Sequence, residues 1–312
     1  MITLLLFLDN LLFLYFMTYQ IWGDSELESD WFARLTPALS SAKILQIKRR
    51  GQNPQHIEEL VMYDRPDIIL CSNDKPILVL EKTREVPTGH NGGQRLGRII
   101  RSLECNVPTI TLLPFRARKH GTHTNICEIN ARLLRAAEIM TNIHNTPCMF
   151  LNWTTNTHGE LIGDGGTAKH LVLLIDQVLN GPLSINNPHV KNAFLDANNA
   201  ALNCEKKHPQ YLLPPRSVSI VPSISCTYTI GMTEENCRRE DPYTGMQFLY
   251  DYLYCRSGPT PIHKHTKLIL NFPNISHQTF QSNNPNCPSR KSSLWYATAN
   301  ELVFNDKQIV LR

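Results

Sequence analysis

Two acidic side chains stand where they could bind a metal ion together. Asp67 opens one short apolar run and Glu81 closes the next, and Ser72–Lys75 between them has the composition of a turn. If the two runs are neighbouring strands, both carboxylates meet at one edge of a sheet. Carboxylate oxygens are ligands that Mg²⁺ prefers, and a bound Mg²⁺ can activate water and neutralise charge on a phosphate. The pair therefore predicts metal-dependent hydrolysis of a phosphate ester.

The residues after Glu81 are too polar to belong to a core. From 81 to 95 the chain reads Glu-Lys-Thr-Arg-Glu-Val-Pro-Thr-Gly-His-Asn-Gly-Gly-Gln-Arg. Thr83 shares the strand face of Glu81, whereas Lys82 points to the opposite face, because side chains alternate along a strand. We count both as candidate catalytic residues. The nucleic-acid contacts expected from this segment are Arg84, Asn91, Gln94 and Arg95.

A basic helix is expected next, from Asn91 to Glu104. Asn91 can cap it, and its apolar residues lie at helical spacing on a separate face. Gln94, Arg98 and Arg101 share one side, which suits contact with a phosphate backbone, so Arg98 joins the candidate nucleic-acid contacts. A solvated helix surface explains the same pattern equally well.

A second basic patch follows the third expected strand. Its residues are Arg116, Arg118, Lys119 and His120. Because parallel strands end at one edge of a sheet, we expect this patch to lie near Glu81. Lys119 and His120 are taken as candidate nucleic-acid contacts, and a charged surface loop is the alternative.

These features together resemble the PD-(D/E)XK nuclease superfamily, to which many restriction endonucleases belong. The resemblance covers residues 58–153 and rests on Pro-Asp at 66–67 and Glu-Lys-Thr at 81–83. It implies that Asp67 and Glu81 bind the metal, with Mg²⁺ as the cofactor. It also implies that a lysine two places after the glutamate positions or activates the attacking water.

The third catalytic position departs from that family. Thr83 stands where the family has its lysine, and a threonine cannot supply a positive charge. Three outcomes stay open. A nearby arginine, such as Arg84 or Arg95, replaces the lysine; or Lys82 reaches in from a distorted strand end; or the site is inactive.

Positioning these residues requires an α/β fold in which helices flank a mixed central β-sheet, a restriction-endonuclease-like core. Residues 31–182 have the matching order of elements. We expect strands at 66–71, 76–83, 107–115 and 148–153, and helices at 56–62, 91–104, 125–142 and 167–179. Residues 183–312 are dominated by prolines, asparagines and short runs, and predict a less regular C-terminal α+β lobe that supports DNA binding.

The bulk properties permit nucleic-acid binding without demanding it. The formal net charge is +4 and the pI about 8.5. None of the nine cysteines belongs to a C-x-x-C pair, which argues against a zinc ribbon and favours reduced thiols in a cytoplasmic protein. Residues 1–30 form an apolar N-terminal extension. Asp9 and Asn10 interrupt its apolar run and no Lys or Arg precedes it, so we expect no membrane anchor.

The combined prediction is an Mg²⁺-dependent DNA endonuclease of restriction type in the cytoplasm. Double-stranded DNA is the expected partner, and a homodimer is the other assembly considered. Two alternatives stay open: a non-catalytic nucleic-acid-binding protein with a degraded nuclease fold, or a subunit of a larger defence complex. A cation close to both carboxylates favours the enzyme, whereas Thr83 alone at that place favours the binding protein.

Overall fold

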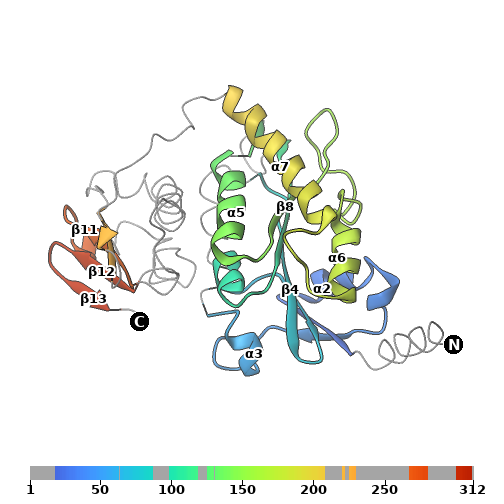
Figure 1. Ribbon diagram of the computed structural model, residues 1–312, viewed down its shortest axis with the longest axis horizontal. Coiled ribbons are helices and arrows are strands. Elements are labelled where there is room, and N and C mark those ends of the chain that lie inside the picture. Colours follow the sequence, from blue (N-terminus) through green and yellow to red (C-terminus); the bar gives the residue numbers. More distant parts are fainter. Residues whose placement is uncertain are drawn as a thin grey trace.

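The structure is a computed structural model, and it describes most of the chain. The described residues are 18–62, 64–86, 98–118, 125–129, 131–207, 220–221, 225–229, 267–279 and 300–310. They form an α/β core that contains the candidate site and a smaller C-terminal sheet, seen at opposite sides of Figure 1. The expected mixed central sheet flanked by helices is confirmed.

Six strands form the central sheet, in the order β2-β1-β3-β4-β5-β8. β1 pairs parallel to β2 and antiparallel to β3, and β3 pairs antiparallel to β4. β4, β5 and β8 are parallel to one another. The strands are β1 (Tyr19–Gly23), β2 (Lys43–Gln46), β3 (Ile68–Ser72), β4 (Lys75–Lys82), β5 (Thr109–Leu113) and β8 (Cys148–Asn152).

The hairpin of β3 and β4 turns tightly at the position that the sequence predicted. Asn73 and Asp74 both have positive φ, 47° and 63°, and two successive left-handed residues give the turn whose twist matches a two-stranded ribbon. Asparagine and aspartate tolerate this conformation better than other residues with a Cβ atom. Next to the turn, Ser72 pairs with Lys75 and Cys71 with Pro76. A register shift after Cys71 then brings Ile68 opposite Leu80, so the end of β4 lies beside the start of β3.

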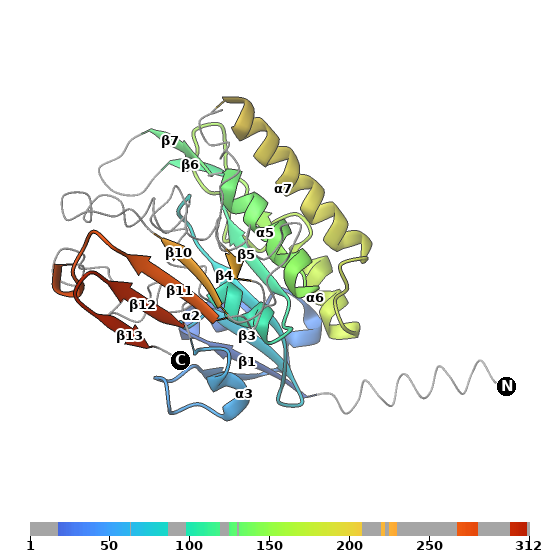
Figure 2. The same cartoon turned by 60° about the vertical axis from the view of Figure 1, so that its left-hand side comes forward.

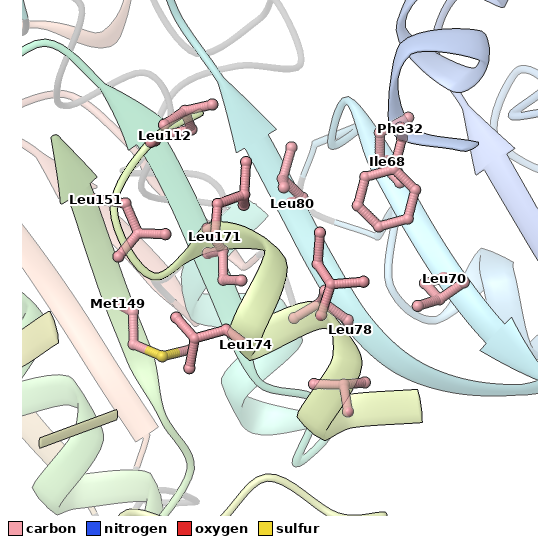
Figure 3. Packing of buried hydrophobic residues seen from close by; sticks show 14 of the residues in the cluster. Phe32, Ile68, Leu70, Leu78, Leu80, Leu112, Met149, Leu151, Leu171 and Leu174 are labelled. Carbon is pink, nitrogen blue, oxygen red and sulfur yellow. The ribbon is translucent and has the colours of Figure 1, made fainter. Parts of the chain in front are cut away.

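Helices cover both faces of the central sheet. On one face Phe32, Leu171 and Leu174 pack against Leu80 and Met149, as Figure 3 shows. These helical residues come from α2 (Glu26–Ala33) and α6 (Leu171–Asn180), and α7 (Pro188–Lys207) joins the same cluster.

The opposite face of the sheet is covered by α3 (Gln55–Glu58) and the segment that follows it. Ile57 and Leu60 pack there against Ile69 and Val79. Residues 98–104 are helical, and α5 (Ala131–His144) packs against β8 and α7. A short 3₁₀ helix, η1 (Pro37–Leu39), precedes β2.

Three parts of the core differ from the sequence-based expectation. β1 lies inside the sheet, although it falls within the residues 1–30 that we assigned to an apolar extension, and α7 packs on the core from beyond residue 182. The helix expected at 125–142 was wrong at its start: Ile126–Glu128 is β7, which pairs with β6 (Arg116–Arg118). β1 is held by pairing with β2 and β3, and β7 by pairing with β6, and local composition does not show such pairing.

The C-terminal part contains a second sheet of five strands, in the order β13-β12-β11-β10-β9. β10, β11 and β12 are parallel, and β9 and β13 pair antiparallel at the two edges. The strands are β9 (Ile220–Val221), β10 (Ser225–Thr229), β11 (Lys267–Phe272), β12 (Glu301–Phe304) and β13 (Gln308–Val310). Phe272 and Phe304 stack with ring centroids 5.1 Å apart. Among the described residues, none of the helices has the length and apolar character to cross a membrane.

Candidate active site

The β3–β4 hairpin brings Asp67 and Glu81 face to face. Ile68 pairs with Leu80, so the next residues outward, Asp67 and Glu81, stand opposite each other. Both side chains lie on the face that carries Val79, because residues alternate along each strand. Asp67 is 8% exposed and Glu81 is 1% exposed. The two carboxylates therefore meet at one sheet edge, nearly out of water, as the sequence predicted.

Backbone hydrogen bonds fix Asp67 at the start of β3. The backbone N–H of Asp24, directly after β1, donates to the carbonyl of Asp67 at 2.8 Å. The backbone N–H of Lys82 donates to Oδ2 of Asp67 at 2.7 Å. The second bond ties the carboxylate to the neighbouring strand, so its remaining oxygen, Oδ1, faces the same side as Glu81.

Arg98 connects the two carboxylates. Its Nη1 donates to Oε1 of Glu81 at 2.6 Å and makes a longer contact of 3.5 Å with Oδ1 of Asp67. Because both contacts share Nη1, Oε1 of Glu81 and Oδ1 of Asp67 lie no farther apart than the sum of the two distances. That limit falls inside the range of roughly 4–7 Å expected of carboxylates that can share a cation. Arg98 is thus the positive charge close to both carboxylates that, by the criterion stated from the sequence, favours the enzyme over the binding protein.

Two further carboxylates lie around this pair, and sequence reasoning missed both. Oδ2 of Asp64 accepts a hydrogen bond from Nε of Arg98 at 2.7 Å. Glu28 follows Ser25, whose hydroxyl caps α2, and is close enough to Glu81 for their charges to interact. Asp64 could have been noticed three residues before Asp67, but Glu28 was hidden in the segment read as an extension.

The crowding of acidic groups changes their ionisation. Burial, and after it the negative charge of Glu81, raises the pKa of Asp67 to about 7. Burial also raises the pKa of Glu28; the hydroxyl of Ser25 opposes this shift and the charge of Glu81 adds to it. Burial alone would lower the pKa of the Arg98 guanidinium, but Glu81 and Asp64 raise it above its ordinary value. Arg98 is therefore permanently charged, whereas Asp67 titrates close to neutral pH.

Lys82 lies on the other face of the sheet, as strand alternation predicted. Its Nζ is 3.7 Å from the ring centroid of Trp31 and 5.3 Å from that of Trp153, which places the ammonium against two aromatic faces. Burial lowers its pKa, and Asp164 and Glu28 oppose that shift. The side chain of Lys82 thus does not reach round a distorted strand end to Glu81, and this residue serves the site through its backbone N–H.

Thr83 shares the side of Glu81 but is engaged locally. Its backbone N–H donates to the carbonyl of Leu112 at 2.9 Å, and its hydroxyl accepts from the backbone N–H of Glu85 at 3.2 Å. The threonine therefore shapes the chain as it leaves β4. Arg84, the next residue, is exposed and close enough to Lys82 for their charges to interact.

Of the remaining residues predicted to contact nucleic acid, the structure describes Arg98 and does not describe the others. Arg98, a predicted nucleic-acid contact, lies in the carboxylate site itself. A local pattern could not show this, because Asp64 and Glu81 reach Arg98 only through the fold. The candidates outside the described residues are Asn91, Gln94, Arg95, Lys119 and His120.

A cavity of about 760 Å³ opens at the opposite end of β4 from Glu81. The β3–β4 turn at Asn73 and the connection from α6 to α7 at Gly181 line it. It shares no lining residue with the carboxylate pair. Since the chemical groups that could act together stand at the other end of the strand, the candidate site is the carboxylate edge and not this cavity.

Comparisons with family models, with curated proteins and with solved structures found no match to this chain. Within the described part of the chain, no group of three or more His, Cys, Asp or Glu side chains is arranged to hold a metal ion. Two carboxylates remain compatible with Mg²⁺, because this ion keeps several waters and commonly takes only one or two protein carboxylates.

Proposed function

We propose that this protein is an Mg²⁺-dependent nuclease of the PD-(D/E)XK type that hydrolyses phosphodiester bonds in double-stranded DNA. The observation that carries the proposal is a buried excess of negative charge at the end of β4. Asp64, Asp67 and Glu81 all contact Arg98, and Glu28 adds its charge from α2. Three carboxylates that contact one guanidinium, with a fourth close to Glu81, favour the addition of a further cation.

A bound cation would offset the free-energy cost of burying these carboxylates. Removing ionised carboxylates from water costs several kcal/mol each even where they are paired, and groups held in such surroundings are concentrated at functional sites. If the end of the β3–β4 hairpin had only a structural role, apolar residues in place of Asp67 and Glu81 would make the protein more stable. The raised pKa of Asp67 is the measurable sign of this cost.

The donor set suits Mg²⁺. Asp67 and Glu81 would hold the ion, each through a carboxylate oxygen that now faces Arg98. When bound, such an ion lowers the pKa of a coordinated water and neutralises charge on the scissile phosphate. The protein itself fixes the two carboxylates by strand pairing and by the bond from the Lys82 backbone, and it keeps Glu81 out of bulk water.

The surroundings of the site also suit a polyanion. Arg84 is exposed directly after β4, and Arg116 and Arg118 are exposed on β6, the short strand that follows β5. Arginine side chains bind phosphate oxygens through paired N–H donors. A duplex that approached the edge of the sheet formed by the ends of the parallel strands would meet these side chains around the carboxylates.

A nucleic-acid-binding protein without catalysis is the second candidate. Two observations favour it. Thr83 holds the position of the lysine, and Arg98 already neutralises part of the carboxylate charge. On this alternative the ion pair is a permanent structural feature and DNA is bound but not cut.

Cleavage of supercoiled plasmid and of linear duplex DNA separates the two candidates. Purified protein is incubated with Mg²⁺, Mn²⁺ or EDTA, and the same series is run for Glu81→Gln. The matched control is Glu104→Gln, which removes a carboxylate paired with Arg101 outside the site. We expect cleavage by the wild type and by Glu104→Gln with metal only, and a loss of at least about a hundredfold in Glu81→Gln, as for other groups that stabilise transition-state charge.

Two results would contradict the proposed nuclease. Cleavage that persists in Glu81→Gln would remove the carboxylate pair from the mechanism. Retained DNA binding without cleavage by the wild type, under either metal, would leave the binding protein as the function.

A further inference from the structure

The guanidinium of Arg98 stands where a metal shared by Asp67 and Glu81 would have to bind. Its Nη1 contacts the nearest oxygen of each carboxylate, at 2.6 Å from Glu81 and 3.5 Å from Asp67. A divalent ion bound through the same oxygens would lie about 2.0–2.6 Å from each of them. Two positive charges that close together repel strongly in a site with so little water. The ion and Nη1 therefore exclude each other.

Asp64 holds the other side of the guanidinium. It accepts from Nε at 2.7 Å, and its side chain, 16% exposed, lies slightly nearer to water than that of Asp67. Arg98 begins the described part of the helix at 98–104, and Ser102 bonds back to its backbone carbonyl. The backbone and Nε of Arg98 are thus anchored independently of Nη1. Loss of the contact with Glu81 does not free the whole side chain.

We propose that Arg98 is an internal counter-cation that occupies the Asp67–Glu81 pair in the metal-free protein and is displaced from it by the divalent ion. This inference rests on the proposed metal-dependent function. The displaced Nη groups remain beside the carboxylate pair, because Asp64 retains Nε. Arg98 then presents its N–H donors to a phosphate next to the ion and supplies the positive charge that Thr83 cannot.

The exchange makes a prediction that a fixed ion pair does not. If Arg98 competes with the metal, then removing its charge must strengthen metal binding while it weakens cleavage. A purely structural arginine would have the opposite effect on the metal, since its loss would disorder both carboxylates. Metal affinity measured without DNA therefore distinguishes the two roles.

Binding of Mn²⁺ to the full chain is followed by the electron paramagnetic resonance signal of the free ion. The proteins compared are the wild type, Arg98→Gln, Arg98→Lys and a matched control, Arg101→Gln, which removes an arginine one turn along the same helix. We expect Arg98→Gln to bind Mn²⁺ at least about tenfold more tightly than the wild type. Arg98→Lys should fall between them and Arg101→Gln should equal the wild type. Cleavage of plasmid DNA by Arg98→Gln should nevertheless be slower.

A second variant guards against misfolding of Arg98→Gln. Asp64→Asn keeps Arg98 but removes the carboxylate that holds Nε, so Nη1 should compete less well and Mn²⁺ binding should tighten by a smaller factor. Unchanged or weaker Mn²⁺ binding in folded Arg98→Gln, or in Asp64→Asn if Arg98→Gln does not fold, overturns the inference.

Glu81→Gln separates this inference from the proposed function. If Mn²⁺ binding is lost in Glu81→Gln but does not respond to Arg98 or Asp64, the metal site stands and only the exchange is wrong. If Mn²⁺ binding is absent in every protein, or does not depend on Glu81, the metal site itself fails and the exchange fails with it.

Discussion

At the scale of single residues, the site is a set of like charges that the fold forces together. Asp67 and Glu81 are nearly buried and share one nitrogen of Arg98, while Asp64 and Glu28 add to the negative charge around them. Such an arrangement, in which the carboxylates outnumber the single guanidinium, is unfavourable unless a further cation or a proton joins it. In the metal-free protein a proton on Asp67 can do so, which links the stability of the chain to pH.

The sign of this dependence follows from the pKa of Asp67. It rises from an ordinary value of 3.8 to about 7 in the folded chain, so the folded state binds this proton more tightly than the unfolded state. The resulting stabilisation is fully present below pH 4 and is lost as the pH rises through 7. We expect the free energy of unfolding of wild type in EDTA to decrease between pH 5 and pH 8, and the decrease to be smaller in Asp67→Asn.

Urea unfolding at a series of pH values measures the effect. The comparison is between the slopes of the two proteins and not between their absolute stabilities, since other groups titrate in both. Equal slopes in wild type and Asp67→Asn would show that Asp67 is not the group that gains the proton.

At the scale of elements, β1 shows how a strand can be central to the fold and invisible to local reasoning. Ile21 is fully buried in the main core cluster, and its register partner in β2, Ile44, is 41% exposed at the sheet edge. We expect Ile21→Ala to destabilise the protein by about 2–5 kcal/mol, as for other buried large-to-small changes. Ile44→Ala should destabilise it by less than about 1 kcal/mol.

Chemical denaturation of the two variants checks this difference. The pair is matched in residue type, in the atoms removed and in place along the paired strands. A loss in Ile44→Ala as large as that in Ile21→Ala would mean that β1 does not hold the interior position described for it.

The elements that sequence reasoning found are those whose signals are local. β3, β4, β5 and β8 are apolar runs bounded by turn residues, and Asn73 with Asp74 marks the hairpin directly. The hairpin brought Asp67 and Glu81 near each other, but their direct opposition also depends on the register shift between Leu70 and Cys71 in the β3–β4 pairing, which local composition does not show. β1 was lost because its apolar residues continue the run that begins at Met1.

The parts of the site that were missed depend on contacts between distant segments. Arg98 was recognised as basic, but its bonds to Asp64 and Glu81 come from segments far apart in the chain. Glu28 reaches the site only because α2 covers the sheet. Strand alternation predicted correctly that Lys82 would face away from Glu81, where Trp31 and Trp153 receive it.

At the scale of the whole molecule, the exposed arginines of β6 stand beyond the core sheet, on the two-stranded ribbon of β6 and β7 (Figure 2). This ribbon is held to the rest of the protein on both sides. The backbone N–H of Arg118 donates to the carbonyl of Gly159 at 2.8 Å, and Lys207 of α7 binds Glu128 of β7 at 2.6 Å. A fixed, basic ribbon beside the ends of β4 and β5 suits a contact with the phosphate backbone of a duplex that lies across the site.

Such a contact has a thermodynamic signature. Each phosphate neutralised by an arginine releases counterions, so the logarithm of the DNA affinity falls with the logarithm of the salt concentration in proportion to the number of contacts. We expect Arg118→Ala to lower that slope by about 1 and to weaken binding alike for unrelated DNA sequences.

The matched control is Lys191→Ala, which removes one exposed positive charge from the start of α7. Fluorescence anisotropy with labelled duplexes between 50 and 200 mM salt, roughly the range over which such slopes are resolved, measures both slopes in Ca²⁺ or EDTA to prevent cleavage. An equal change in the two variants would indicate a response to net charge alone and would remove the ribbon from the DNA-binding surface.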